Sequence, residues 1–223
     1  MNTIAIGDIH GCSLQLSNLL SSIRKLAFDQ VVFLGDYVDV GKDSFGVIEL
    51  LIAFKKEFPT TKFLKGNHEV SLLNYFYEGN FAEYAQKGGL PTIRSYCGKV
   101  SGDVHSCFVD RLPKHHLEFL EQLELYYEQD DTFFSHAGFD PHYPKIRTVE
   151  ALVGTSHNPE GFVDGVDGKT LVCGHYFQEN GMPRISDNFV AVDTGCGVIG
   201  GPLTAIQLPS RKIVQSFPAT SDV

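Results

Sequence analysis

The sequence predicts an α/β fold of two packed sheets with helices outside them, and two patterns lead to this expectation. In the first half, short apolar strands alternate with amphipathic helices, as in βαβ units. In the second half, short strands follow one another between glycine, proline and polar residues. With 223 residues and 43% hydrophobic content, the chain can bury one core. We therefore expect a single domain over residues 1–217 and a tail over 218–223.

The N-terminal third of the chain contains two βαβ units. In the first helix, leucine and isoleucine recur on one face, and Ser44 is expected to cap the second helix. Pro59 ends that helix before the next strand. The expected elements are, in order, Thr3–Ile6, Ser13–Leu26, Gln30–Leu34, Ser44–Lys56 and Lys62–Leu64.

The remainder of the chain divides into a helical part and a strand-rich part. Helical periodicity returns in His68–Tyr77 and Lys114–Leu123, whereas Gly88–His105 between them has no clear pattern. We expect a cap or lid over about residues 78–115. From Leu125 onward we expect a mostly β layer. Its strands are Leu125–Glu128, Thr132–Ser135, Leu171–Cys173, Phe189–Val192, Leu203–Leu208 and Lys212–Ser216.

Charge and composition exclude several classes of partner. The formal net charge of −9 argues against a general nucleic-acid or anionic-membrane binder, so a phosphate substrate would have to be attracted locally by metal ions. No stretch has the length and hydrophobicity of a membrane span, and no signal sequence precedes the first strand. Five cysteines without a CxxC pair indicate reduced thiols. We expect a cytoplasmic protein; the sequence does not indicate its oligomeric state.

Three short polar strings follow strands at nearly even intervals. They are Gly7–Gly11, Gly35–Asp39 and Gly66–Glu69, and Asp36 follows Asp8 by 28 residues, as Asn67 follows Asp36 by 31. This is about the length of a strand, a helix and a return strand, so the three side chains would meet at one sheet edge. Carboxylate, amide and imidazole ligands suit divalent first-row metals. The spacing therefore predicts a two-metal hydrolase.

Two histidines extend this constellation. His136 and His175 each come at the end of a strand-like run and beside a glycine or small-residue turn. Taken singly, such residues also suit ordinary turns and helix starts. Five strings in this order favour a metal site.

Together these strings resemble the calcineurin-like metallophosphoesterases. Within that family they are similar to the phosphoprotein phosphatase branch, which includes bacterial and phage serine/threonine phosphatases and symmetrical dinucleoside tetraphosphatases. Gly41–Ile48 and Val192–Ala205 also look like segments of bacterial members. The resemblance implies a four-layer α-β-β-α sandwich of two mixed sheets, with a dinuclear metal site at the C-terminal ends of the strands.

The resemblance also implies roles for individual residues. His68 would be the general acid and Asp39 the carboxylate that orients it, while a water shared by two divalent metals attacks phosphorus. Manganese is expected first, with iron, zinc or cobalt as alternatives. The implied ligands are Asp8 and His10 for the first metal, Asp36 for both, and Asn67, His136 and His175 for the second.

The chain departs from the family pattern in its phosphate-binding arginines. Val40 stands where the family usually has arginine, and Thr155–Val166, where a second arginine is expected, contains none. Lys42, Arg94 and Arg147 are the candidate replacements, although each also suits a solvated charge. A lysine cannot reproduce the bidentate grip of a guanidinium.

These features lead to three functional hypotheses. A serine/threonine protein phosphatase comes first, and a symmetrical dinucleoside polyphosphate hydrolase is the alternative. A non-catalytic phosphate-binding scaffold comes last. The substrate is accordingly expected to be a phosphorylated protein or a small phosphate ester. The remaining motif-free histidines, which we expect to have surface or core roles, are His115, His116, His142 and His157.

Overall fold

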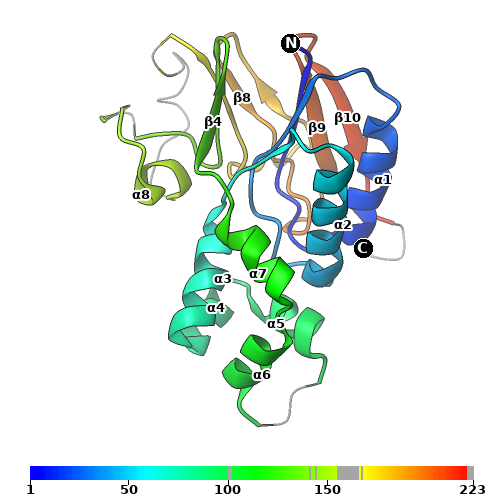
Figure 1. Cartoon of the computed structure of the whole chain (residues 1–223). Helices are drawn as coiled ribbons and strands as arrows, with labels where there is room; N and C mark the ends of the chain where they lie inside the picture. Colours follow the sequence, from blue (N-terminus) through cyan, green and yellow to red (C-terminus); the bar gives the residue numbers. More distant parts are fainter. Residues whose placement is uncertain (100–101, 141, 144, 155–165, 167, 220–223) are drawn as a thin grey trace.

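The computed structural model describes residues 1–99, 102–140, 142–143, 145–154, 166 and 168–219. Its strands form two five-stranded sheets (Figure 1). Among the described residues, no helix combines the length and apolar character needed to cross a membrane.

The first sheet has the order β10-β9-β1-β2-β3. Its strands are β1 (Thr3–Ile6), β2 (Gln30–Phe33), β3 (Lys62–Phe63), β9 (Leu203–Leu208) and β10 (Lys212–Ser216). Strands β1, β2 and β3 are parallel, so their carboxyl ends lie at one edge. Strands β9 and β10 form an antiparallel hairpin that pairs with the other side of β1.

The position of this hairpin corrects the expectation of one β layer built by the second half. All four residues of β1 are buried, which is incompatible with an open sheet edge. The C-terminal hairpin supplies the missing neighbour and so joins the first sheet, not the second.

The second sheet has the order β4-β5-β6-β8-β7. Its strands are β4 (Tyr126–Gln129), β5 (Thr132–Ser135), β6 (Thr170–Cys173), β7 (Arg184–Ile185) and β8 (Phe189–Ala191). Strands β5, β6 and β8 are parallel. The two-residue β7 was not expected, because it is too short to show an alternating pattern.

Helices cover the outer faces of both sheets, which confirms the four-layer arrangement (Figure 1). Helices α1 (Ser13–Ile23) and α2 (Ser44–Glu57) pack on the first sheet, and α8 (Val149–Val153) packs on the second. Between the sheets lies an apolar layer to which both contribute. Its members include Ala5, Val32, Phe134, Val172 and Ile206.

Two helix ends differ from the sequence-based expectation. Asp43, not Ser44, caps α2, because its carboxylate accepts the N–H of Gly46 at 2.9 Å. Helix α1 ends at Ile23, three residues before the expected Leu26. The N–H groups after it bond three residues back, which tightens the chain out of the α-helix.

Five further helices gather at the end of the sheets opposite the N-terminus (Figure 1). They are α3 (Asn67–Glu78), α4 (Phe81–Gln86), α5 (Leu90–Cys97), α6 (Val104–Arg111) and α7 (Lys114–Glu121). The stretch Gly88–His105, which showed no pattern, contains α5 and the start of α6. Helices this short do not complete enough turns to show a clear period. Their buried side chains join the same apolar cluster as α1 and α2.

Candidate dinuclear metal centre

The expected ligands lie at the carboxyl ends of neighbouring strands. Asp8 follows β1, Asp36 follows β2, and Asn67 opens α3, the next element after β3. His136 and His175 follow β5 and β6 of the second sheet. The site therefore lies where strand ends of both sheets meet.

Backbone contacts fix the loops that carry these ligands. The N–H groups of Ile9 and His10 both donate to the carbonyl of Asp36 at 2.9 Å. The backbone of His10, Asp36 and His175 lies in the left-handed region, with φ of 46°, 51° and 62°. Strained conformations of this kind occur where the surrounding structure holds a functional side chain in place.

Asp36 lies between two groups of potential ligands. One group comprises His10, Asp36 and His68, and the other comprises Asp36, His136 and His175, with the ligand atoms of each group within 4.8 Å of one another. Asp36 Oδ2 is 3.9 Å from His10 Nε2 and 3.3 Å from His136 Nε2. Asn67 Oδ1 joins the second group at 2.9 Å from His136 Nε2. A carboxylate shared in this way could bridge two ions.

Asp8 is buried beside the second group. Its carboxylate accepts the N–H of His175 at 3.0 Å, and a Cβ at Gly174 would lie only 2.1 Å from Asp8 Oδ1. A larger residue at position 174 would therefore displace the Asp8 carboxylate. Burial raises the pKa of Asp8, and the carboxylates of Asp193 and Asp36 raise it further.

Asp193 is a buried carboxylate that the sequence analysis did not assign to the site. It follows β8 as Asp8 follows β1, and it accepts the N–H of Gly195 at 2.9 Å. Burial raises the pKa of Asp193 to about 6. Asp193 could have been predicted from the sequence, because it is an acidic residue just after an apolar strand, as Asp8 is.

The donor set fits two divalent cations. Buried carboxylates that raise one another's pKa need nearby positive charge, which metal ions supply. The Nδ1 atoms of His136 and His10 lie 2.9 and 3.3 Å from the carbonyls of Leu34 and Val38. A carbonyl only accepts, so each Nδ1 carries the proton and each Nε2 is left for a metal. Burial lowers the pKa of His175 to about 4, which keeps its imidazole neutral and able to bind metal.

His68 and Asp39 form a hydrogen-bonded pair beside Asp36. His68 Nδ1 lies 2.8 Å from Asp39 Oδ2, and the His68 ring is 4.8 Å from that of His10. Burial disfavours the imidazolium, but Asp36 and Asp39 outweigh it and raise the pKa of His68 to about 9. The His68 side chain is 16% exposed, whereas that of Asp39 is fully buried. The raised pKa favours the imidazolium form of His68 at neutral pH, and part of its ring is accessible to solvent.

Helices α4 and α5 hold Asp39 in place. Its Oδ1 accepts from the hydroxyls of Tyr84 at 2.6 Å and Thr92 at 2.7 Å, and its N–H donates to Thr92 Oγ1 at 2.8 Å. The Ser44 hydroxyl lies 2.8 Å from the same Thr92 oxygen. No sequence signal pointed to Tyr84 or Thr92. Thr92 lies in the stretch Gly88–His105, which has no clear pattern, and Tyr84 lies just before that stretch and in no motif.

Glu69 ties the Asp36 loop to α3. Its buried carboxylate accepts the N–H groups of Asp36 at 2.9 Å, Tyr37 at 2.7 Å and Gly66 at 2.9 Å. Glu69, the last residue of the string Gly66–Glu69, therefore fixes the backbone of the loop that carries Asp36.

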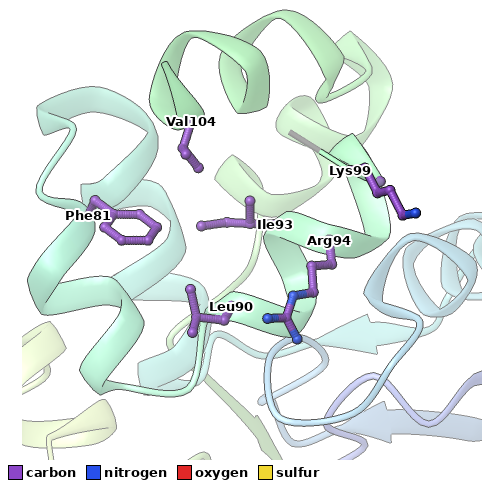
Figure 2. A pocket seen from close by; sticks show the side chains of 7 residues that line it. Phe81, Leu90, Ile93, Arg94, Lys99 and Val104 are labelled. Carbon is purple, nitrogen blue, oxygen red and sulfur yellow. The ribbon is translucent and has the colours of Figure 1, made fainter. Parts of the chain in front are cut away.

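The three positively charged side chains that are candidates for binding phosphate lie in three different places. Lys42 lines a cavity of about 380 Å³ together with Val40, Gly41 and Gly11, which adjoin Asp39 and His10. Arg94 on α5 lines a different hollow, of about 710 Å³. Figure 2 shows Arg94 together with Phe81 and Val104, which also line this hollow.

Arg147 packs in another place, on the second sheet. Its guanidinium lies 4.5 Å from the Phe133 ring centre and 3.9 Å from a Glu128 oxygen. Phe133 belongs to the cluster between the second sheet and α8, so Arg147 lies on that outer face. Residues 155–165 of the segment Thr155–Val166 lie outside the described part of the chain.

Two bacterial relatives are both described as bis(5'-nucleosyl)-tetraphosphatase PrpE, asymmetrical. The relative from Oceanobacillus iheyensis is 27% identical over 232 residues, which cover 94% of this chain and 89% of the relative. The relative from Halalkalibacterium halodurans is 28% identical over 237 residues, which cover 96% and 92%.

Solved structures show the same fold. A putative diadenosine tetraphosphatase has a TM-score of 0.62 at 24% identity, covering 98% of this chain and 94% of that chain. A protein serine/threonine phosphatase from Saccharomyces cerevisiae has a TM-score of 0.64 at 16% identity, covering 98% and 80%.

The family model that matches describes the calcineurin-like phosphoesterases, and it matches residues 1–192. This range contains all five strings on which the resemblance was based. The chain therefore belongs to the calcineurin-like phosphoesterase family.

Proposed function

We propose that the chain hydrolyses phosphate esters or anhydrides with two divalent metal ions, and that His68 protonates the leaving oxygen. The observation that carries this proposal is the His68–Asp39 pair at 2.8 Å, placed beside the Asp36 carboxylate that both ligand groups share. A hydrogen-bonded acid next to a dinuclear centre is what phosphoryl hydrolysis requires.

The metal ligands in this proposal are divided between the two sheets. Asp36 is shared. Carboxylate, amide and imidazole donors suit manganese, iron, zinc and cobalt, and manganese is the first of these that we propose. When bound, two such ions activate water and neutralise phosphate oxygens. The proposed ligands of one ion are Asp36, Asn67, His136 and His175. Those of the other ion are His10 and Asp36, together with Asp8, which the resemblance to the family assigns to it.

The protein itself contributes to this reaction a proton held on the His68 ring. Asp39 accepts from His68 Nδ1, so the second ring nitrogen, Nε2, is the atom that donates to the leaving oxygen. The raised pKa of His68 keeps that proton in place at neutral pH. Tyr84 and Thr92 keep Asp39 oriented throughout.

For the substrate, we propose a dinucleoside tetraphosphate ahead of a phosphorylated protein. Three observations support this order: Val40 offers no charged contact to a terminal phosphate, a 380 Å³ cavity is lined by the chain neighbours of His10 and Asp39, and the two bacterial relatives are named tetraphosphatases. A phosphoserine or phosphothreonine protein, the first expectation from the sequence, is the second candidate, favoured by the similarity of Gly41–Ile48 to bacterial protein phosphatases.

A substrate panel distinguishes the two candidates. The manganese-loaded protein is assayed with diadenosine tetraphosphate, a phosphothreonine peptide and p-nitrophenyl phosphate. We expect the highest kcat/KM for diadenosine tetraphosphate, and its products show which anhydride is cleaved: AMP with ATP, or two molecules of ADP. A higher kcat/KM for the phosphopeptide would reverse the proposed order.

The general acid is tested with His68→Asn. We expect kcat to fall by about 10²–10⁴ for substrates with poor leaving groups and by less for p-nitrophenyl phosphate, whose leaving oxygen needs little protonation. His142→Asn, which removes an exposed imidazole, is the matched control and should change neither rate. Equal losses across leaving groups would show that His68 positions phosphate or metal instead.

A further inference from the structure

A second group of metal-ligating side chains lies at the contact between α2 and α7. Its members are Glu49 on α2 and the adjacent His115 and His116 on α7. Both histidine Nε2 atoms lie 2.9 Å from the same oxygen, Oε1 of Glu49. One ligand atom from each residue therefore lies within 4.8 Å of the other two, as at the dinuclear centre.

These distances are close to those of a zinc site. Zinc binds imidazole nitrogen and carboxylate oxygen at about 2.0–2.2 Å in tetrahedral geometry, so its ligand atoms lie about 3.3–3.5 Å apart. Pairs at 2.9 Å need to open by only a few tenths of an ångström. Two histidines and one glutamate also leave a fourth position for water, as in open zinc sites.

His116 is held in the orientation that a ligand needs. Its side chain is fully buried, with its ring 5.0 Å from that of Phe45. Its Nδ1 lies 2.9 Å from the Tyr96 hydroxyl, which can accept the Nδ1 proton and leave Nε2 free for a metal. Burial lowers the pKa of His116, consistent with a neutral imidazole.

The other two members give an ion access from solvent. The side chains of His115 and Glu49 are 54% and 45% exposed. The buried histidine is already oriented for an ion, and the two exposed side chains leave a path by which the ion can enter from solvent.

We propose that Glu49, His115 and His116 bind one zinc ion, which links α7 to α2. Helix α2 begins at Ser44, whose hydroxyl contacts Thr92 next to Asp39. The ion would therefore tie the helical end of the molecule to the helix that starts beside the catalytic pair. This proposal is independent of the substrate and of the chemistry at the dinuclear centre.

The test counts ions per chain. The full-length protein is saturated with manganese, equilibrated with micromolar zinc, desalted and analysed for both metals. We expect the wild type to retain one more ion per chain than His115→Ala. His142→Ala is the matched control, because it removes an exposed histidine and keeps the cluster, and it should behave like the wild type.

Glu49→Gln separates metal binding from hydrogen bonding. Glutamine still offers a carbonyl oxygen to the histidine N–H groups, but it lacks the anionic carboxylate oxygen with which glutamate binds zinc. Zinc at about a hundred times its Kd should raise the unfolding temperature of the wild type by about 5–10 °C, and this shift should be lost in His115→Ala and Glu49→Gln. Equal ion contents and equal shifts in the wild type and both variants would overturn the proposal.

Discussion

Val40 stands at the position where the resemblance led us to expect a phosphate-binding arginine. Its backbone has a φ of 62°, which is unfavourable for a β-branched side chain, and its N–H donates to Gly88 at 3.1 Å. Val40→Arg should add a charge-assisted phosphate contact of about 1.5–3 kcal/mol and raise kcat/KM for a phosphomonoester about tenfold. Steady-state kinetics with p-nitrophenyl phosphate measures this change.

Val40→Arg changes two things at once, because it removes a β-branched residue from a strained backbone position and adds a positive charge. Val40→Leu is the matched control: it removes the β-branch without adding charge, so it should raise thermal stability but leave kcat/KM unchanged. Lys42 lines the same cavity as Val40. If Lys42 already holds the phosphate, Val40→Arg will not raise kcat/KM, and Lys42→Ala will raise KM.

At the scale of elements, α4 and α5 support the proposed catalytic pair, His68 and Asp39, through hydrogen bonds to Asp39. Tyr84→Phe removes the hydroxyl that donates to Asp39 at 2.6 Å and keeps the ring. We expect kcat to fall by about 2- to 10-fold, as for loss of one hydrogen bond of about 0.5–1.5 kcal/mol, with little change in KM.

Tyr75→Phe is the matched control for this prediction. The Tyr75 ring stacks on that of Tyr84 at 4.8 Å, but its buried hydroxyl has no hydrogen-bond partner among the described residues. Removing that hydroxyl should leave kcat unchanged and should not lower the unfolding temperature. A loss of activity as large as that of Tyr84→Phe would show that the stacked rings, not the bond to Asp39, support the site.

The elements also show what could be predicted from the sequence. The βαβ units and the residues at their strand ends were predictable, because a strand, a helix and a following acid are all local signals. Tyr84 and Thr92 were not, since only tertiary packing brings α4 and α5 to Asp39. The pairing of β9 with β1 was missed for the same reason: an alternating pattern identifies a strand without identifying its neighbour.

At the scale of the whole molecule, the candidate metal centre joins the two sheets. Asp8, Asp36 and Asn67 come from the first sheet, while His136 and His175 come from the second. Their buried charges lie at the end of the apolar layer between the sheets. Stability should therefore depend on both metal and pH.

The metal-free protein should lose stability between pH 7 and 9. The folded-state pKa of His68, about 9, lies above its usual value of about 6.5. The stabilisation of the folded state by this charge is fully present below pH 6.5 and is lost as the pH rises through 9. The free energy of unfolding that is lost in this way is at most about 3 kcal/mol. Burial raises the pKa of Glu69 from 4.5 to about 7, so its contribution has the same sign but is lost mainly below this window. At His136, the Asp36 carboxylate outweighs burial and raises the pKa, which acts in the same direction as His68. His10 and His175, whose pKa values burial lowers, act oppositely but titrate below this window.

Metal binding should reverse this trend, because cations neutralise the buried carboxylates and compete with protons for the ligands. The difference in unfolding temperature between manganese-loaded and chelated protein should therefore widen from pH 7 to pH 9, as measured by thermal unfolding at each pH. In the chelated His68→Asn variant, which lacks the group that titrates near 9, stability should fall less over the same range. An equally steep decline in that variant would show that another group, and not the imidazolium paired with Asp39, controls the stability of the metal-free fold.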